Sequence, residues 1–312
     1  MAQRGDTGKV VVLDNSVLSD VFARHAGTDM DARIPGAVVE HRIVIWTSPY
    51  LITETIAGST EDPRSARRKL EFLLEVSEGH LLKNPRELLN WEGTHGGSPT
   101  GTDLFSAHNE EMEVYRWALD VADANGVVVD PGDGSEHSFR DLVYQDKSKG
   151  QLAAVQATKA ARDAVIRAFE ASKGDSSTDQ NEAQSLAADT GGVNFPALGT
   201  WMRSMSRDDF AGWVSSALEQ IGYHRTVSAQ DLSLLPHTVS ATGYLLSEIA
   251  GNYVTGKKWH RNDTYDTQYC VAASCADILI TSDRGLQALC SQMPYRPFEV
   301  GGVEELERLL VP

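Results

Sequence analysis

The stretch NDTYDTQYCVAASCADILITSDRGLQAL (Asn262–Leu289) decides the fold, because it combines an acidic loop, helical segments and one buried strand. Asp263 and Asp266 lie in the loop, and a helix is expected directly after them over Thr267–Cys275. The helix leads into a short apolar run, and a further helix follows that run. This alternation of helix and strand indicates an α/β fold.

The apolar run of this stretch is Ile278–Thr281 (ILIT), with Asp277 directly before it and Asp283 shortly after it. A strand of about four residues with a carboxylate past its C-terminal end is typical of an open α/β sheet, because such sheets place their sites at that edge. The stretch alone supplies only part of a site. Carboxylates at equivalent positions elsewhere in the chain would complete it.

A buried strand is also expected near the N-terminus, over KVVVL (Lys9–Leu13), and it ends at Asp14. A continuous β-branched run is typical of a strand buried on both faces of a parallel sheet. A helical spacing of apolar residues follows over Asn15–His25. Asp14 is therefore predicted at the same sheet edge as Asp283. Asp is also a good helix cap, and this position alone fits a cap and a site equally well.

The next expected strand is Arg42–Thr47 (RIVIWT), and Ser48 and Pro49 then begin a helix that extends to Ala57. Glu54 falls among the apolar residues of this helix. A lone carboxylate there is costly to bury unless it is paired or bound to a metal ion. The alternative is a solvated helix face, because threonines flank Glu54 on both sides.

Composition limits the class of protein. The 312 residues carry 28 Lys and Arg against 44 Asp and Glu, so the net charge is −16, which disfavours a general nucleic-acid coat protein. A nuclease is still compatible, because its basic groove can be local and its metals add positive charge. The sequence shows neither a signal peptide nor an apolar run long enough for a membrane span, so we expect a cytoplasmic protein.

The three cysteines, Cys270, Cys275 and Cys290, form no C-x-x-C pair and suit a reducing compartment, where they act as small buried hydrophobes. No activating histidine is evident beside any of them, which disfavours a thiol nucleophile.

The order of the segments predicts a mainly helical insertion, residues 81–236, between two parts of an α/β domain, residues 1–80 and 237–312. Loops are expected over residues 26–41 and Trp91–Asp103, because both are polar and rich in Gly or Pro. Single helices are expected over Leu152–Ser172 and Met202–Ile221.

A basic run, KKWHR, begins with Lys257 and Lys258 and directly precedes the acidic loop. Basic groups beside carboxylates are what a phosphodiester enzyme needs to hold a polyanion against its metals. The alternative is a solvated connector.

Three segments in order resemble the PIN-domain family of metal-dependent nucleases: LDNSVLSDVF (residues 13–22), IWTSPYLITETIAG (residues 45–58) and DTQYCVAASCADILITSDRGL (residues 266–286). The resemblance covers residues 9–78 and 238–301. It implies a three-layer α/β/α sandwich on a short parallel sheet, with an acidic pocket at the carboxyl ends of the strands. Four positions match the family's metal-binding carboxylates, namely Asp14, Glu54, Asp266 and Asp283, and Asp263 and Asp277 are additional acids nearby.

Oxygen ligands without His or Cys suit Mg²⁺ or Mn²⁺. The resemblance therefore implies a nuclease in which metal-activated water cleaves single-stranded RNA, with DNA as the alternative polymer. Ser16 matches a hydroxyl beside the metal or scissile phosphate, and the other expected substrate contacts are Asn15, Thr281, Arg284, Lys257 and Lys258. An inactive PIN-like scaffold and a different α/β phosphoryl-transfer enzyme are the rival interpretations. Many family members are toxins, so an antitoxin-like inhibitor and a homo-oligomer are further expectations.

Overall fold

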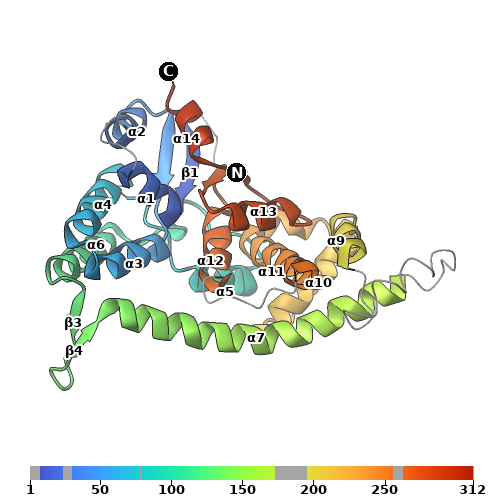
Figure 1. The fold of residues 1–312 in the computed structure, drawn as a ribbon. Helices are drawn as coiled ribbons and strands as arrows, with labels where there is room; N and C mark the ends of the chain where they lie inside the picture. The colour runs from blue at the N-terminus through green and yellow to red at the C-terminus, as the bar shows by residue number, and fades with distance from the viewer. Residues whose placement is uncertain (1–7, 24–29, 78, 173–194, 256–262, 312) are drawn as a thin grey trace.

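The computed structural model describes residues 8–23, 30–77, 79–172, 195–255 and 263–311 (Figure 1). Within these ranges the chain is a mixed α/β structure, mostly helical, built around a small parallel sheet. No helix of the described ranges is long and apolar enough to cross a membrane.

Within the described residues, four parallel strands form the sheet in the order β2 (Ile43–Trp46), β1 (Lys9–Leu13), β5 (Ile278–Ile280) and β6 (Glu299–Gly301). β1 lies in the middle and pairs with β2 on one side and with β5 on the other. Strands from opposite ends of the sequence are therefore neighbours, and both end at the same edge of the sheet, as predicted for Asp14 and Asp283. The α/β class and the parallel sheet are confirmed.

The central strands are buried on both faces. Val11, Val12 and Leu13 of β1 are fully inaccessible to solvent, as are Leu279 and Ile280 of β5. Burial of each such aliphatic side chain contributes about 1.5–3 kcal/mol, which is why a continuous apolar run without polar alternation forms these strands.

Helices surround the sheet (Figure 1). α12 contacts both β1 and β5, α2 contacts β2, and α14 contacts β5 and β6. The helices contributed by the two terminal parts of the chain are α1 (Asn15–Ala23), α2 (Met30–Val39), α3 (Pro49–Ala57), α4 (Pro63–Val76), α12 (Asp263–Ala273), α13 (Arg284–Gln292) and α14 (Val303–Leu309).

The middle of the chain is helical apart from one hairpin, β3 (Val127–Val129) with β4 (Glu136–Ser138). Its helices are α5 (Pro85–His95), α6 (His108–Asp123), α7 (Phe139–Ser172), α9 (Phe195–Arg203), α10 (Arg207–Gln220) and α11 (Pro236–Thr255), the last of which begins at the predicted boundary. α7 is the longest of them and runs along one side of the molecule, where it contacts α3, α11 and α12 (Figure 1).

Residues from the middle of the chain belong to two separate apolar cores. Leu81, Leu88 and Tyr115 join the core of the sheet. The second core lies between α7, α9, α10 and α11, with Phe210 and Leu246 among its buried residues. The first part of the predicted insertion therefore packs as part of the α/β domain, and the predicted division at residue 80 does not separate two cores.

Several predicted boundaries are corrected. The expected loop over residues 26–41 contains α2, because Met30, Ile34 and Ala37 bury one helical face despite Pro35. The expected loop from Trp91 begins inside α5, and the expected helix over residues 202–221 is divided into α9 and α10. The division falls where the Ser206 hydroxyl accepts the Asp209 N–H and so begins a new helix.

Candidate active site

Asp14 is buried at the junction of β1 and α1, with only 4% of its surface exposed. Its Oδ1 accepts hydrogen bonds from the Ser16 hydroxyl at 2.6 Å and from the Val17 N–H at 3.0 Å. Its Oδ2 accepts one from the Thr281 hydroxyl, just past the end of β5. Asp14 therefore does cap α1, and the cap fixes its carboxylate at the carboxyl edge of the sheet.

Further hydrogen bonds tie the ends of β1 and β5 together. The Asp14 N–H donates to the Ile280 carbonyl at 3.1 Å, and the Ser282 N–H donates to the Ser16 hydroxyl at 2.8 Å. Because Ser16 accepts from one segment and donates to Asp14, it links both strand ends to one carboxylate. Such a polar network holds a functional side chain in one orientation.

Burial raises the pKa of Asp14 above its usual value, and the hydrogen bonds from Ser16, Thr281 and Val17 oppose this increase. The negative charge of Glu54 raises the pKa of Asp14 further. The two carboxylates are therefore close enough to repel each other, although 40 residues separate them along the chain. A cation near both would relieve that repulsion.

Glu54 lies on α3 and has a partner on each oxygen. Lys147 of α7 donates to Oε1 at 2.8 Å, and the Tyr269 hydroxyl donates to Oε2 at 2.8 Å. The side chains of Glu54 and Lys147 are only 17% and 7% exposed. The solvated-face alternative for Glu54 is therefore wrong, because its carboxylate is paired inside the protein.

Tyr269 lies near three of the predicted carboxylates and is hydrogen-bonded to one of them, Glu54. Burial raises its pKa well above the usual value, and the negative charges of Glu54, Asp14 and Asp266 act in the same direction. The phenol therefore stays protonated and acts as a hydrogen-bond donor to Glu54. Asp266 lies one turn earlier on α12 and accepts a hydrogen bond of 3.5 Å from the Tyr244 hydroxyl.

Asp266 and Asp263 belong to α12, whereas the sequence pattern predicted both to precede this helix. Asp263 is the first residue of α12, and its side chain lies outside the described residues. Lys257 and Lys258 also lie outside the described residues.

Asp283 is exposed and caps α13: its Oδ1 accepts the N–H groups of Gly285 at 2.6 Å and Leu286 at 3.1 Å. Its own N–H donates to the Thr281 hydroxyl at 3.0 Å. Asp283 is thus bonded to the residue that holds Asp14, while its carboxylate serves the start of a helix.

Asp277 belongs to the opposite end of β5, and the structure corrects its assignment to the acidic group. Its Oδ2 accepts the Val10 N–H at 2.8 Å, near the beginning of β1. At about 3.3 Å per residue, the three residues of β5 separate Asp277 from Thr281 by roughly 13 Å. The carboxylate closes the amino edge of the sheet instead.

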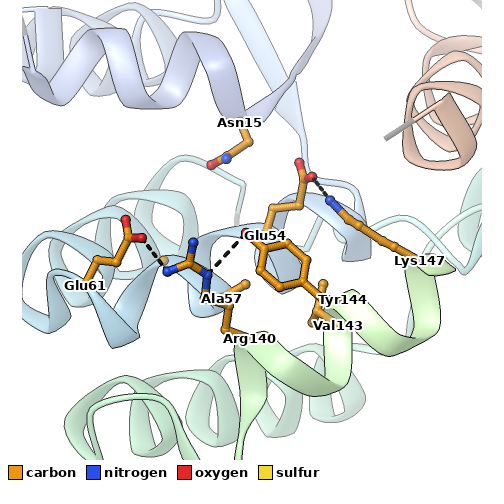
Figure 2. A pocket seen from close by; sticks show the side chains of 9 residues that line it. Asn15, Glu54, Ala57, Glu61, Arg140, Val143, Tyr144 and Lys147 are labelled. Atoms are coloured by element: carbon orange, nitrogen blue, oxygen red, sulfur yellow. Dashed lines mark hydrogen bonds and ion pairs between the residues drawn. The ribbon is translucent and has the colours of Figure 1, made fainter. Parts of the chain in front are cut away.

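A pocket of about 190 Å³ opens beside Glu54, and α7 forms one wall of it (Figure 2). Asn15 lines the pocket from the start of α1, and Arg140, Tyr144 and Lys147 line it from α7. Arg140 pairs with Glu61 and donates to the Tyr144 hydroxyl at 3.2 Å. Both cations of the pocket thus already have carboxylate partners.

A second pocket of about 420 Å³ is lined by Ser16, Ser282 and Arg284, with the acidic residues Asp20 and Glu304. Asn15 and Ser16, which directly follow Asp14, therefore line different pockets. The buried Asp14 carboxylate directly precedes both residues but lines neither pocket.

The sequence interpretation missed Tyr269, Arg140, Tyr144 and Lys147. Tyr269 lies in the stretch that decides the fold, where its place one turn after Asp266 was the available signal. The residues of α7 recur at positions i, i+4 and i+7, which places them on one helical face. Nothing in the sequence indicates that this face meets α3.

No group of three His, Cys, Asp or Glu side chains in the described ranges is spaced to hold a metal ion. Asp14, Glu54 and Asp266 nevertheless come from three different elements and all raise the pKa of the same residue, Tyr269, by their negative charge. Mg²⁺ usually takes one or two protein carboxylates and completes its shell with water and phosphate oxygens. Asp14 and Glu54 could supply carboxylate oxygens to one such ion only in competition with their present partners, of which the Lys147 ammonium group is the charged one.

Neither a family model, nor a curated protein, nor a solved structure matches this chain.

Proposed function

We propose that the chain is a metal-dependent nuclease that hydrolyses phosphodiester bonds within single-stranded RNA, on a PIN-like three-layer arrangement. One observation carries the proposal: a buried aspartate, Asp14, is fixed between the ends of two parallel strands, and Glu54 and Asp266 act on the same tyrosine hydroxyl beside it. Functional sites of open parallel sheets lie at this edge.

Asp14 and Glu54 would hold the Mg²⁺ or Mn²⁺ ion. Asp266, which raises the pKa of Tyr269, and Asp283, whose N–H is bonded to Thr281, are the further candidates. Such an ion, when bound, lowers the pKa of a water molecule and stabilises the charge that develops on the phosphate. Ser16 and Thr281 orient Asp14, and the Tyr269 hydroxyl orients Glu54. This division of roles supports a preorganised site, in which neighbouring hydroxyl groups hold the ligands in one orientation.

The two pockets support a polymer as the substrate. A chain that crosses the turn at Asp14 would place consecutive phosphates near Arg140 and Lys147 on one side and near Arg284 on the other. Arg140 and Lys147 are already paired with Glu61 and Glu54, so they would contact phosphate only when those pairs open, and the net charge of −16 opposes long-range attraction of nucleic acid. Because both sides of the turn are open, cleavage within the strand is favoured over cleavage from an end.

The test is incubation of the purified protein with labelled single-stranded RNA and DNA, with Mn²⁺ and with EDTA. We expect Mn²⁺-dependent cleavage of RNA into internal fragments, and none with Asp14→Asn. Equal cleavage by wild type and Asp14→Asn would contradict the site. Cleavage of DNA alone would change the substrate and leave the site intact.

A specific observation favours a second function, that of a binding protein without catalysis: Lys147 already neutralises Glu54. If the protein binds single-stranded RNA with an affinity that neither Mn²⁺ nor EDTA changes, and leaves the RNA uncut, the binding function replaces the nuclease.

A further inference from the structure

Lys147 is held in the acidic site by two contacts. Its Nζ lies 2.8 Å from Glu54 Oε1 and 4.0 Å from the centre of the Tyr265 ring. The pair is largely screened from water, because the side chain of Lys147 is 7% exposed. A charge removed from water in this way needs its partner, and Glu54 supplies it.

The surroundings of this ammonium group carry an excess of negative charge. Glu54 and Asp14 repel each other, and Asp266 adds a third negative charge near the Tyr269 hydroxyl. Lys147 lies at hydrogen-bond distance from Glu54, whereas the hydrogen bonds to the Asp14 carboxylate come from two hydroxyl groups and one backbone N–H, which carry no full positive charge. Lys147 therefore occupies one of the two Glu54 oxygens, and the Tyr269 hydroxyl occupies the other.

We infer that Lys147 is an exchangeable counter-ion: it neutralises Glu54 while no divalent cation is bound, and turns to a phosphate of the nucleic-acid strand when such a cation takes Glu54. This inference rests on the proposed function. It assigns to α7 a part in substrate binding at the same site.

The chemistry of lysine suits this exchange. An ammonium group and a divalent cation repel each other at one carboxylate oxygen, so binding of the metal ion weakens the contact between Lys147 and Glu54. The lysine has a flexible four-carbon stem, so its charge can move while the helix stays in place. The neighbouring pocket, about 190 Å³ and open beside Lys147, gives the released ammonium group a place (Figure 2).

The pocket also offers the partners that a phosphate group needs. Arg140 lies seven residues before Lys147 on the same face of α7, and the Asn15 side chain faces the pocket from α1 (Figure 2). Once Lys147 has left Glu54, its positive charge has no carboxylate partner, whereas Arg140 stays paired with Glu61. The pocket would then offer one unpaired positive charge to a phosphate. Binding of metal and binding of phosphate are then coupled, each favouring the other.

The first test measures Mn²⁺ affinity of the full chain by isothermal titration calorimetry, without nucleic acid. Lys147→Met removes the competing charge, so we expect Mn²⁺ to bind about tenfold more tightly than to wild type. Lys147→Arg retains a cation and should stay near wild type. Lys149→Met is the matched control, because Lys149 is exposed on the same helix, two residues further along. Thermal melting of each variant verifies that it is folded.

The outcomes separate this inference from the proposed function. If wild type binds Mn²⁺ and Lys147→Met binds it no more tightly, the exchange is wrong and the metal site stands. If wild type and Lys147→Met both fail to bind Mn²⁺, the metal-dependent function fails together with the inference.

The second test measures binding of a short 2′-O-methyl RNA, which resists cleavage, by fluorescence anisotropy. Mn²⁺ should tighten RNA binding by wild type. In Lys147→Met this tightening should be at least about fivefold smaller, although the variant binds the metal ion more tightly. An equal gain in both proteins would show that Lys147 does not turn to the phosphate and would overturn the inference.

Discussion

The Thr281 hydroxyl donates a hydrogen bond to Asp14 Oδ2 across 267 positions of sequence, and this contact joins the two ends of the chain into one site. The Thr281 hydroxyl also accepts the backbone N–H of Asp283, so one threonine contacts the carboxylate of Asp14 and the main chain of Asp283. A single side chain thus orients the buried acid and the turn that carries the exposed one.

Thr281→Val is expected to destabilise the protein by about 1–3 kcal/mol, because it keeps the shape of the side chain and leaves a buried carboxylate oxygen without a donor. The pKa of Asp14 should also rise further, since this bond lowers it. Urea unfolding at pH 7 measures the change. Thr281→Ser keeps the hydroxyl and should lose less stability than Thr281→Val. A Thr281→Val variant as stable as wild type would show that the hydrogen bond to Asp14 does not stabilise the fold.

Asp14→Asn is expected to reduce cleavage of RNA at least about 100-fold, because it removes a charged ligand from the proposed metal ion. The fold should persist. The amide oxygen can still accept from Val17 and Ser16, and the Thr281 hydroxyl can rotate to accept from the new amide group. Cleavage rate and circular dichroism test the two parts separately, and an unfolded variant would make the activity loss uninformative about ligation.

Asp283→Asn gives a different result for stability and activity. Asn caps helices about as well as Asp, so the two N–H groups of α13 keep their acceptor and the melting temperature should change little. If Asp283 contributes to the metal site, cleavage falls about tenfold or more. Unchanged cleavage would reduce Asp283 to a helix cap, which is the one role that its hydrogen bonds establish.

The sheet could be predicted from sequence because burial on both faces leaves a local signal. Residues 10–13 (VVVL) and 278–280 (ILI) contain no polar residue, which is typical of a strand covered on both faces. Asp14 could be predicted with them, because it directly follows a strand. The place of a residue can thus be predicted from the sequence when it depends on the neighbouring residues along the chain.

The partners of Glu54 could not be predicted in this way. Lys147 lies 93 positions away on a helix whose polar and apolar residues fit a solvated surface as well as a pocket wall. No histidine was evident in the sequence beside the cysteines, yet the His237 Nε2 lies 3.6 Å from the Cys275 sulfur. This contact also joins residues far apart in the sequence, so it could not be predicted either. Burial keeps both groups neutral, because it raises the pKa of the thiol and lowers that of the imidazole.

Glu54→Gln is expected to lower the free energy of unfolding by about 2 kcal/mol, because Lys147 stays largely buried without its negative partner. Removal of both charges, in Glu54→Gln with Lys147→Met, should recover part of this loss. A double-mutant cycle by urea unfolding measures the coupling, expected near 1–2 kcal/mol. Additive effects within about 0.3 kcal/mol would show that the pair does not stabilise the fold.

The stability of the protein should depend on pH through His237, whose pKa is lowered to about 4 by burial. Its Nδ1 lies 2.5 Å from the Ser274 hydroxyl. The folded state holds this imidazole neutral, whereas the unfolded chain binds a proton below about pH 6.5. The contribution of His237 is therefore complete above pH 6.5 and is lost as the pH falls toward 4, up to about 3 kcal/mol.

Glu92 changes the stability with pH in the opposite direction to His237. The effect of His237 must therefore be measured by comparing wild type with a His237 variant. Burial raises the pKa of Glu92 to about 7, so its contribution is complete below about pH 4.5 and is lost as the pH rises through 7. The difference in unfolding free energy between wild type and His237→Asn removes this shared term. We expect that difference to fall by about 2 kcal/mol from pH 7.5 to pH 5.0, measured in urea, because only wild type protonates an unfolded imidazole at this position. A difference that is constant with pH would mean that the folded protein accepts the proton on His237 as readily as the unfolded chain does.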